Sequence, residues 1–231
     1  MNLSIFDLFK IGVGPSSSHT MGPMTASYNF MLYCKTNGLL NQINKIQVKL
    51  HGSLAWTGKG HGSDRAIILG LSGFTPDSIS ADDMVKVNNL VHINNYIEYE
   101  NKKIKINPTS DIIFDYEKLF KLHSNAIEFS IFFDNNLIFT KIYYSIGGGF
   151  VVTDDVKRNN SINYNLKFEF NSGEELLTIS KNQNVSIPEL IYENENTISP
   201  NLDISKNLMK IWGTMNECIN RGVNSKATLP G

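Results

Sequence analysis

The 231-residue chain lacks most features that would place it in a specialised class of protein. It has two cysteines, Cys34 and Cys218, whose spacing fits neither a zinc site nor a disulfide framework, so a reduced, cytoplasmic setting is expected. No run approaches the ~18 apolar residues of a membrane span, and residues 1–10 do not have the composition of a signal peptide. The formal net charge is −1, with no basic run. We therefore expect neither a membrane nor a nucleic acid as partner.

Several common catalytic motifs are also missing. The sequence has no P-loop, no strand-linked G-x-G-x-x-G fingerprint and no lysine in a setting typical of a Schiff base. Nucleotide and pyridoxal phosphate chemistry are therefore disfavoured. The hydrophobic fraction of 41% is enough for a packed core, and the length fits one large domain or one domain with an appendage.

The hydrophobic periodicity of residues 1–155 changes repeatedly between helical and strand types. Helices are expected at 4–11, 24–37, 64–71 and after a capping box at 80–83, and strands at 46–50, 104–106, 127–133, 138–144 and 150–153. The stretches 12–22 and 52–62 are expected to be glycine-rich loops, and Asn135–Asn136 a tight turn. This pattern predicts an α+β domain with a mixed sheet.

The remaining residues predict a short helical extension. Residues 156–200 are expected to form a polar linker at 159–165, a strand through Leu166, Phe168 and Phe170, and two helices opened by Ser172–Glu175 and Ser186–Glu189. Residues 201–231 are expected to begin a further helical domain. Its first helix has a broad apolar stripe and little chain left to cover it, which favours a separate partner: Leu208, Ile211, Trp212, Met215 and Ile219.

The loop Gly14–Thr20 is the strongest candidate for a functional site. Four hydroxyls, from Ser16, Ser17, Ser18 and Thr20, accompany the imidazole of His19. Glycines allow backbone N–H groups to converge on an anion, hydroxyls can donate to a carboxylate, and His19 can move a proton near neutral pH. The alternative interpretation, weighted about equally, is a polar surface loop that caps the following helix.

A second glycine-rich loop, 51–64, holds His51, Lys59, His61, Ser63 and Asp64. His61 lies between two glycines, which favours an active role, whereas His51 is expected to be structural at a strand end. Lys59 either attracts an anion or solubilises the loop. Loops between a strand and a helix often carry functional residues.

Three other segments are weaker candidates. His123 and Asn125 precede the clearest strand and can both bind a ligand through hydrogen bonds, although a structural role is favoured for His123. His92 is expected at a helix surface. The run Gly147–Gly149 fits either a bulge or a close approach of the backbone to a ligand.

These segments together resemble the single-chain, iron–sulfur-dependent L-serine dehydratases, which are L-serine ammonia-lyases. The resemblance lies in residues 4–23, which include Gly14-Pro-Ser-Ser-Ser-His-Thr20, in the loop 51–64, in Asn107-Pro108, in 122–126, and in Tyr143-Tyr-Ser-Ile-Gly-Gly-Gly-Phe-Val-Val152. The segments occur in the family's order across nearly the whole chain.

The resemblance implies a β domain related to an allosteric substrate-binding fold, and a following α domain or α subunit that supplies a [4Fe–4S] cluster. It implies L-serine as substrate and assembly into a homo-oligomer such as a dimer. The implied roles are substrate binding by Ser16, Ser17, Ser18, Thr20, Ser63 and Asn125, and acid–base chemistry by His19 and His61, with His123 second. No residue of this chain matches a metal ligand of the family.

The resemblance leaves the function of the isolated chain open. The sequence ends at Leu229-Pro-Gly231, where the family's α domain is expected to start, so a truncated product or one of two subunits is implied. The main hypothesis is the β portion of an L-serine deaminase that is inactive alone. The alternatives are a non-catalytic serine-binding regulatory module and a truncated remnant.

Overall fold

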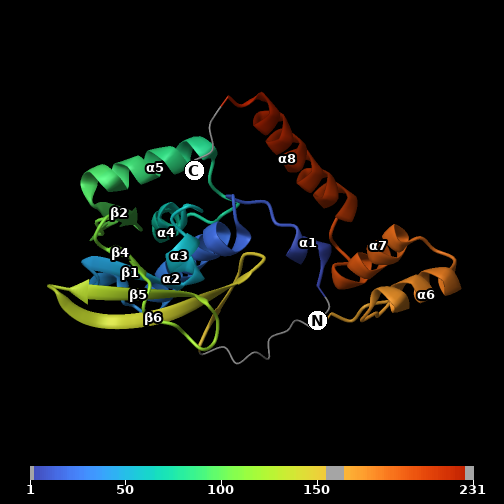
Figure 1. Cartoon of the computed structure of the whole chain (residues 1–231), viewed down its shortest axis with the longest axis horizontal. Coiled ribbons are helices and arrows are strands. Elements are labelled where there is room, and N and C mark those ends of the chain that lie inside the picture. The colour runs from blue at the N-terminus through green and yellow to red at the C-terminus, as the bar shows by residue number, and fades with distance from the viewer. Residues whose placement is uncertain (1–2, 155–163, 227–231) are drawn as a thin grey trace. The chain divides into compact units, whose positions relative to one another are not determined.

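A computed structural model describes residues 3–154 and 164–226 (Figure 1). The chain forms two compact units. One includes the described residues from Ile11 to Asp154, and the other contains the described residues up to Lys10 together with those from Tyr164 onward. The first unit combines a mixed sheet with helices, which confirms the predicted α+β class.

The sheet of the first unit is organised around β1 (Lys45–Gly52). This strand pairs in parallel with both β3 and β4 on one side and antiparallel with β5 on the other, and the seven described strands run in the order β2-β3-β1-β5-β6-β7, with β4 beside β1. The other strands are β2 (Tyr96–Tyr99), β3 (Lys102–Lys105), β4 (Ile112–Asp115), β5 (Asn125–Phe133), β6 (Asn136–Gly147) and β7 (Phe150–Thr153).

Helices cover one face of this sheet (Figure 1). They are α2 (Gly22–Thr36), α3 (Ser53–Thr57), α4 (Ser63–Leu71) and α5 (Ala81–Asn94). The core lies between α2, α4 and the sheet, where Phe30 of α2 stacks on Phe129 of β5 with ring centroids 4.8 Å apart and meets Tyr143 of β6 edge-on at 6.4 Å. Alternate residues of β1 and β5 point into this core, as their period of two predicts.

The helices α2 and α4 approach closely at Gly70. A Cβ atom at this position would lie 2.2 Å from the Met24 carbonyl oxygen and 2.6 Å from Ser27 Cβ. We expect Gly70→Ala to destabilise the chain by about 1–3 kcal/mol, because the helices must separate. Gly213→Ala is the matched control, since a Cβ there meets nothing within 4 Å and alanine favours a helix by about 0.5–1 kcal/mol. Urea denaturation should show a lower free energy of unfolding for Gly70→Ala and a higher one for Gly213→Ala. An unchanged free energy of unfolding in Gly70→Ala would contradict the close approach of α2 and α4.

The second unit consists of α1 (Ile5–Leu8), α6 (Gly173–Gln183), α7 (Ile187–Ile198) and α8 (Ile204–Asn224). A buried carboxylate on α7 fixes the first helix, because Glu195 accepts hydrogen bonds from Ser4 Oγ and the Ile5 N–H, both at 2.7 Å. Such charge-assisted bonds at a helix N-terminus are among the stronger polar contacts. The N-terminal residues therefore pack with the C-terminal helices, an arrangement that the sequence pattern did not reveal.

Several predicted elements differ from the structure. The predicted strand at Leu166–Phe170 is wrong: the main chain of Phe168 instead pairs with the Asn194 side chain, whose Oδ1 accepts from the Phe168 N–H at 2.8 Å and whose Nδ2 donates to its carbonyl at 2.9 Å. Both glycine-rich loops contain helix, namely a π-helical turn at Ser17–Met21 and α3. Most of the predicted 159–165 linker lies outside the described residues.

Other expectations are confirmed with small shifts. The turn between β5 and β6 has positive φ angles at Asp134 and Asn135, one residue earlier than predicted. Ser186 and Glu189 form the reciprocal capping box that opens α7. The apolar stripe of α8 is exposed at Trp212 and Ile219. No helix in the described ranges is long and apolar enough to cross a membrane.

Candidate active site

The loop around Ser16 is held by its own hydrogen bonds. The Ser16 hydroxyl accepts from the His19 N–H at 3.1 Å, and the Ser16 carbonyl accepts from the N–H groups of Thr20 and Met21, each at 3.0 Å. These N–H groups therefore already donate hydrogen bonds within the loop, whereas the glycines had predicted free N–H groups that converge on an anion. A π-helical turn of this kind is rare and is often found at functional sites. Hydroxyl and imidazole groups are what the loop presents.

His19 is half-buried between hydroxyl groups. Its Nδ1 lies 2.8 Å from Ser18 Oγ and its Nε2 lies 3.1 Å from Ser53 Oγ, while its main-chain carbonyl accepts from Ser63 Oγ. Burial lowers the pKa of His19, the neighbouring His61 lowers it further, and a hydrogen bond with Ser53 opposes the shift. The ring is consequently neutral near pH 7 and fixed at both nitrogens.

His61 lies beside His19, with ring centroids 5.1 Å apart. Its Nδ1 is 2.9 Å from the Thr57 carbonyl oxygen. Because a carbonyl only accepts, Nδ1 must carry the proton, and the neutral ring then has its lone pair on Nε2. The main-chain carbonyl of His61 accepts from Thr20 Oγ1 at 2.8 Å, so the two predicted loops are joined directly.

Asn125 connects the sheet to this loop through Ser145. Its Nδ2 donates to the Ser145 carbonyl at 3.1 Å, and Ser145 Oγ donates to the Ser18 carbonyl at 2.7 Å. The Asn125 Oδ1 is buried without a hydrogen-bond partner among the described residues. A buried acceptor of this kind is costly unless something else fills it, so Asn125 can still accept a hydrogen bond from a ligand.

The predicted site residues therefore separate into groups. Those brought together around the two histidines are Ser16, Ser18, His19, Thr20, His61 and Ser63. The side chain of Ser17 is exposed. His123 lies two residues before β5 and caps its start, since its Nδ1 accepts from the Asn125 N–H at 3.0 Å.

Sequence reasoning missed Ser53 and Ser145, which contact the loop from α3 and β6. A polar residue inside an apolar strand was the available signal for Ser145. It is fully buried, and a Cβ atom at Gly22 would lie 1.9 Å from its hydroxyl oxygen. Gly147–Gly149 form the β6–β7 turn with positive φ angles, as glycines allow.

The described residues do not fit an iron–sulfur cluster. Cys34 is fully buried in the apolar core on α2, where burial raises the pKa of its thiol to about 12, and Cys218 is exposed on α8 in the other unit. Within the described part of the chain, no three His, Cys, Asp or Glu side chains are grouped to hold a metal ion. Cluster ligands are thiolates, and neither cysteine lies among the residues around His19.

Comparison with known proteins places these features in a family. The family model described as the serine dehydratase beta chain matches residues 4–156. The chain is 36% identical to an L-serine dehydratase of Streptomyces coelicolor over 238 residues, covering 100% of this chain and 52% of the relative.

Two further relatives agree. L-serine dehydratase 1 of Escherichia coli is 33% identical over 231 residues, which cover 99% of this chain and 51% of that protein. An L-serine dehydratase of Helicobacter pylori is 38% identical over 236 residues, which cover 100% and 51% respectively. The chain thus spans about half the length of the curated relatives it matches. On the match to residues 4–156, the chain belongs to the serine dehydratase beta chain family.

Proposed function

We propose that this chain is the β-domain portion of an L-serine ammonia-lyase, which converts L-serine to pyruvate and ammonia. The observation that carries the proposal is the pairing of His19 and His61, 5.1 Å apart, among the hydroxyls of Ser16, Ser18 and Ser53. Two imidazoles and several hydroxyls suit a small, polar, zwitterionic substrate. The names of the relatives supply the substrate class.

The geometry suggests different tasks for the two histidines. His61 is the stronger candidate for the base that removes the α proton, since its Nδ1–H donates to Thr57 and leaves a lone pair on Nε2. His19 has a hydroxyl at each ring nitrogen, so it is suited to orient Ser18 and Ser53. We assign the hydroxyls of Ser16, Ser18, Thr20 and Ser63, with Ser17, to the substrate carboxylate and its surroundings.

The proposal needs a second polypeptide region. The family resemblance implies a [4Fe–4S] cluster in an α domain or α subunit, and the described residues offer no set of ligands for it. On the family resemblance we assign residues 1–155 to the β domain, 156–200 to a linker with helices, and 201–231 to the start of the α domain, with residues 3–10 of the β domain packed in the unit that holds the C-terminal helices. Homo-oligomerisation and a cytoplasmic location remain part of the proposal.

A second candidate is a serine-binding module without catalysis. It is favoured by one observation: the histidines and hydroxyls of the candidate site all lie in one compact unit of this chain. On this alternative, L-serine binds to the isolated chain and is released unchanged.

Calorimetry on the isolated chain tests whether the candidate site binds serine. We expect saturable binding of L-serine, weaker binding of D-serine, and about 10- to 150-fold weaker L-serine binding in Ser18→Ala, because one hydrogen bond to a charged group contributes about 1.5–3 kcal/mol. His92→Ala is the control, since this residue is exposed on α5. Absence of L-serine binding would contradict the site assignment. Once the half of the relatives that this chain lacks is supplied, formation of pyruvate from L-serine distinguishes the ammonia-lyase from the non-catalytic serine-binding module.

A further inference from the structure

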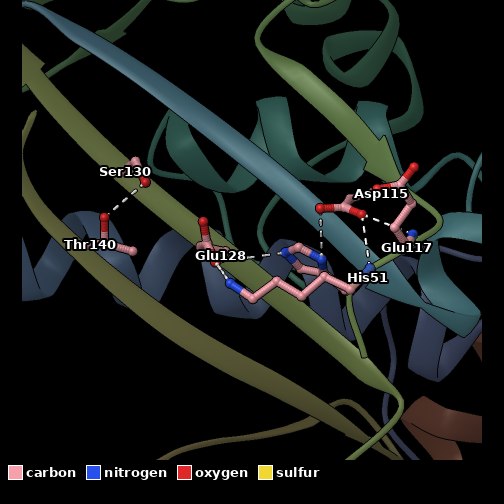
Figure 2. Close-up of polar contacts among 7 residues, drawn as sticks. His51, Asp115, Glu117, Glu128, Ser130 and Thr140 are labelled. Carbon is pink, nitrogen blue, oxygen red and sulfur yellow. Dashed lines mark hydrogen bonds and ion pairs between the residues drawn. The ribbon is translucent and has the colours of Figure 1, made fainter. Parts of the chain in front are cut away.

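A second cluster of polar side chains, centred on His51, lies apart from the candidate site, on the sheet face opposite the helices. Figure 2 shows His51 at the end of β1 between Asp115 of β4 and Glu128 of β5. Its Nδ1 is 3.5 Å from Asp115 Oδ2 and its Nε2 is 3.9 Å from Glu128 Oε2. The side chain is 1% exposed, yet neither ring nitrogen has a hydrogen-bond partner within residues 3–154 and 164–226. We call His51, Asp115, Lys118 and Glu128 the His51 cluster.

A purely structural role explains this arrangement poorly. A buried polar group normally has a hydrogen-bond partner, and leaving two ring nitrogens without one is unfavourable. Two carboxylates lie about 1 Å beyond the distance of a charge-assisted hydrogen bond. The environment is therefore incomplete for a neutral ring, whereas it would suit a protonated one after a small movement.

The residues 116–124 cover this histidine. Phe120 meets the His51 ring edge-on, with centroids 5.0 Å apart, and meets Tyr144 of β6 at 6.0 Å. Lys118 lies 4.7 Å from the Phe120 ring centroid and holds Glu128 Oε2 at 2.7 Å. The segment then leads to His123 and Asn125 of the candidate site. Lys118 in this segment and His51 beneath it thus both face the same carboxylate oxygen, Glu128 Oε2.

The charges around His51 come from every element packed against it. Asp115 on β4 and Glu128 on β5 favour the protonated ring, whereas Lys49 on β1 and Lys118 in the covering segment oppose it. The Tyr144 hydroxyl of β6 is bonded to Asp154 instead. Burial is the largest influence and lowers the pKa of His51 from its ordinary value of 6.5. The neutral ring is thus the form at pH 7, and protonation requires a pH below the ordinary range of histidine.

We propose that protonation of His51 transfers Glu128 from Lys118 to the imidazolium and so releases the segment 116–124 from the sheet. Asp115 then binds Nδ1–H through Oδ2, while its Oδ1 keeps the N–H groups of Glu117 and Lys118 at 3.0 and 3.1 Å. The start of the segment stays fixed, and the part that carries Phe120 becomes free. His51 is a positioning residue on this account. This exchange does not depend on the proposed function.

NMR spectroscopy of the 231-residue chain, isotopically labelled at histidine, lysine and phenylalanine, tests the proposal between pH 5 and 8 without substrate. We expect the His51 ring to titrate with a midpoint below 6.5, and the Lys118 Cε and Phe120 ring signals to move with the same midpoint. The proposal is overturned if His51 stays neutral across the range, or if it titrates while Lys118 and Phe120 do not respond. Since no serine is present, neither result bears on the deaminase proposal.

Three variants test whether Glu128 changes its ion-pair partner from Lys118 to His51, as opposed to a change in packing alone. Glu128→Gln removes the shared carboxylate and should weaken proton binding at His51 about tenfold. Lys118→Met removes the competing cation, so it should strengthen proton binding at His51 and abolish the linked movement of Phe120. Glu117→Gln is the matched control, because Glu117 is exposed and engages Asp115 only through its main chain. If Glu128→Gln does not fold, Lys118→Met tests the proposal alone, because Lys118 is half-exposed and its substitution should be tolerated. An equal midpoint of the His51 titration in Lys118→Met and in the unaltered chain overturns the proposal.

Discussion

His61→Gln is expected to slow L-serine deamination by about 10²–10⁴-fold, the usual contribution of a positioned general base. The reaction would be measured with the chain completed by the remaining half of a relative. Glutamine can still donate from its amide to the Thr57 carbonyl, as Nδ1 of His61 does at 2.9 Å. It has no basic lone pair where Nε2 lies. The change therefore removes the proton acceptor while it preserves the local contact.

The same change elsewhere gives the control. His92→Gln alters an exposed residue of α5, whose Nδ1 contacts the Asn88 carbonyl at 2.8 Å just as His61 contacts Thr57, and it should leave the rate unchanged. His19→Gln should mainly raise KM, since both ring nitrogens of His19 contact hydroxyls. An unaltered rate in His61→Gln would show that His61 takes no part in the acid–base chemistry. A larger loss of kcat in His19→Gln than in His61→Gln would show that His19 is the base and His61 the orienting residue.

The parts of the site that the sequence predicted are local in the chain. Ser16, Ser18 and His19 form one short loop, so their proximity follows from chain connectivity. Ser145 is 127 residues from Ser18, and no local pattern indicates that its hydroxyl donates to the Ser18 carbonyl. The sheet brings them together, because Ser145 near the end of β6 lies against Gly22, the first residue of α2. Long-range polar contacts of this kind depend on topology, which a single sequence specifies weakly.

The fold shows the same division. The long alternation at Ile127–Phe133 predicted β5 correctly, since a strand with one buried face needs that period. A similar but shorter alternation at Leu166–Phe170 did not give a strand. There the Asn194 side chain supplies both hydrogen bonds that a neighbouring strand would have made to Phe168. Apolar alternation indicates which faces are buried, but the partner of the main chain has to come from elsewhere in the fold.

Gly52 has a more demanding role than the glycine-rich loop around it suggested. Its φ and ψ angles are 57° and −129°, outside the regions open to residues with a side chain, and a Cβ atom would lie 2.1 Å from the Ser124 carbonyl oxygen. That carbonyl accepts from the Ser53 N–H at 3.2 Å. Gly52 therefore lets the end of β1 lie against the start of β5, between Ser53, which contacts His19, and Asn125.

Gly52→Ala is accordingly expected to destabilise the chain by about 3 kcal/mol or more, because backbone strain and a main-chain clash act together. Gly38→Ala is the matched control: its φ of 69° is similarly left-handed, but a Cβ there meets nothing within 4 Å, so only the conformational cost of about 1–2 kcal/mol applies. Urea denaturation measures both. Equal losses would mean that the chain relieves the clash by a small shift of Ser124, in which case Gly52 is required only for its backbone angles and does not fix Ser53 beside His19.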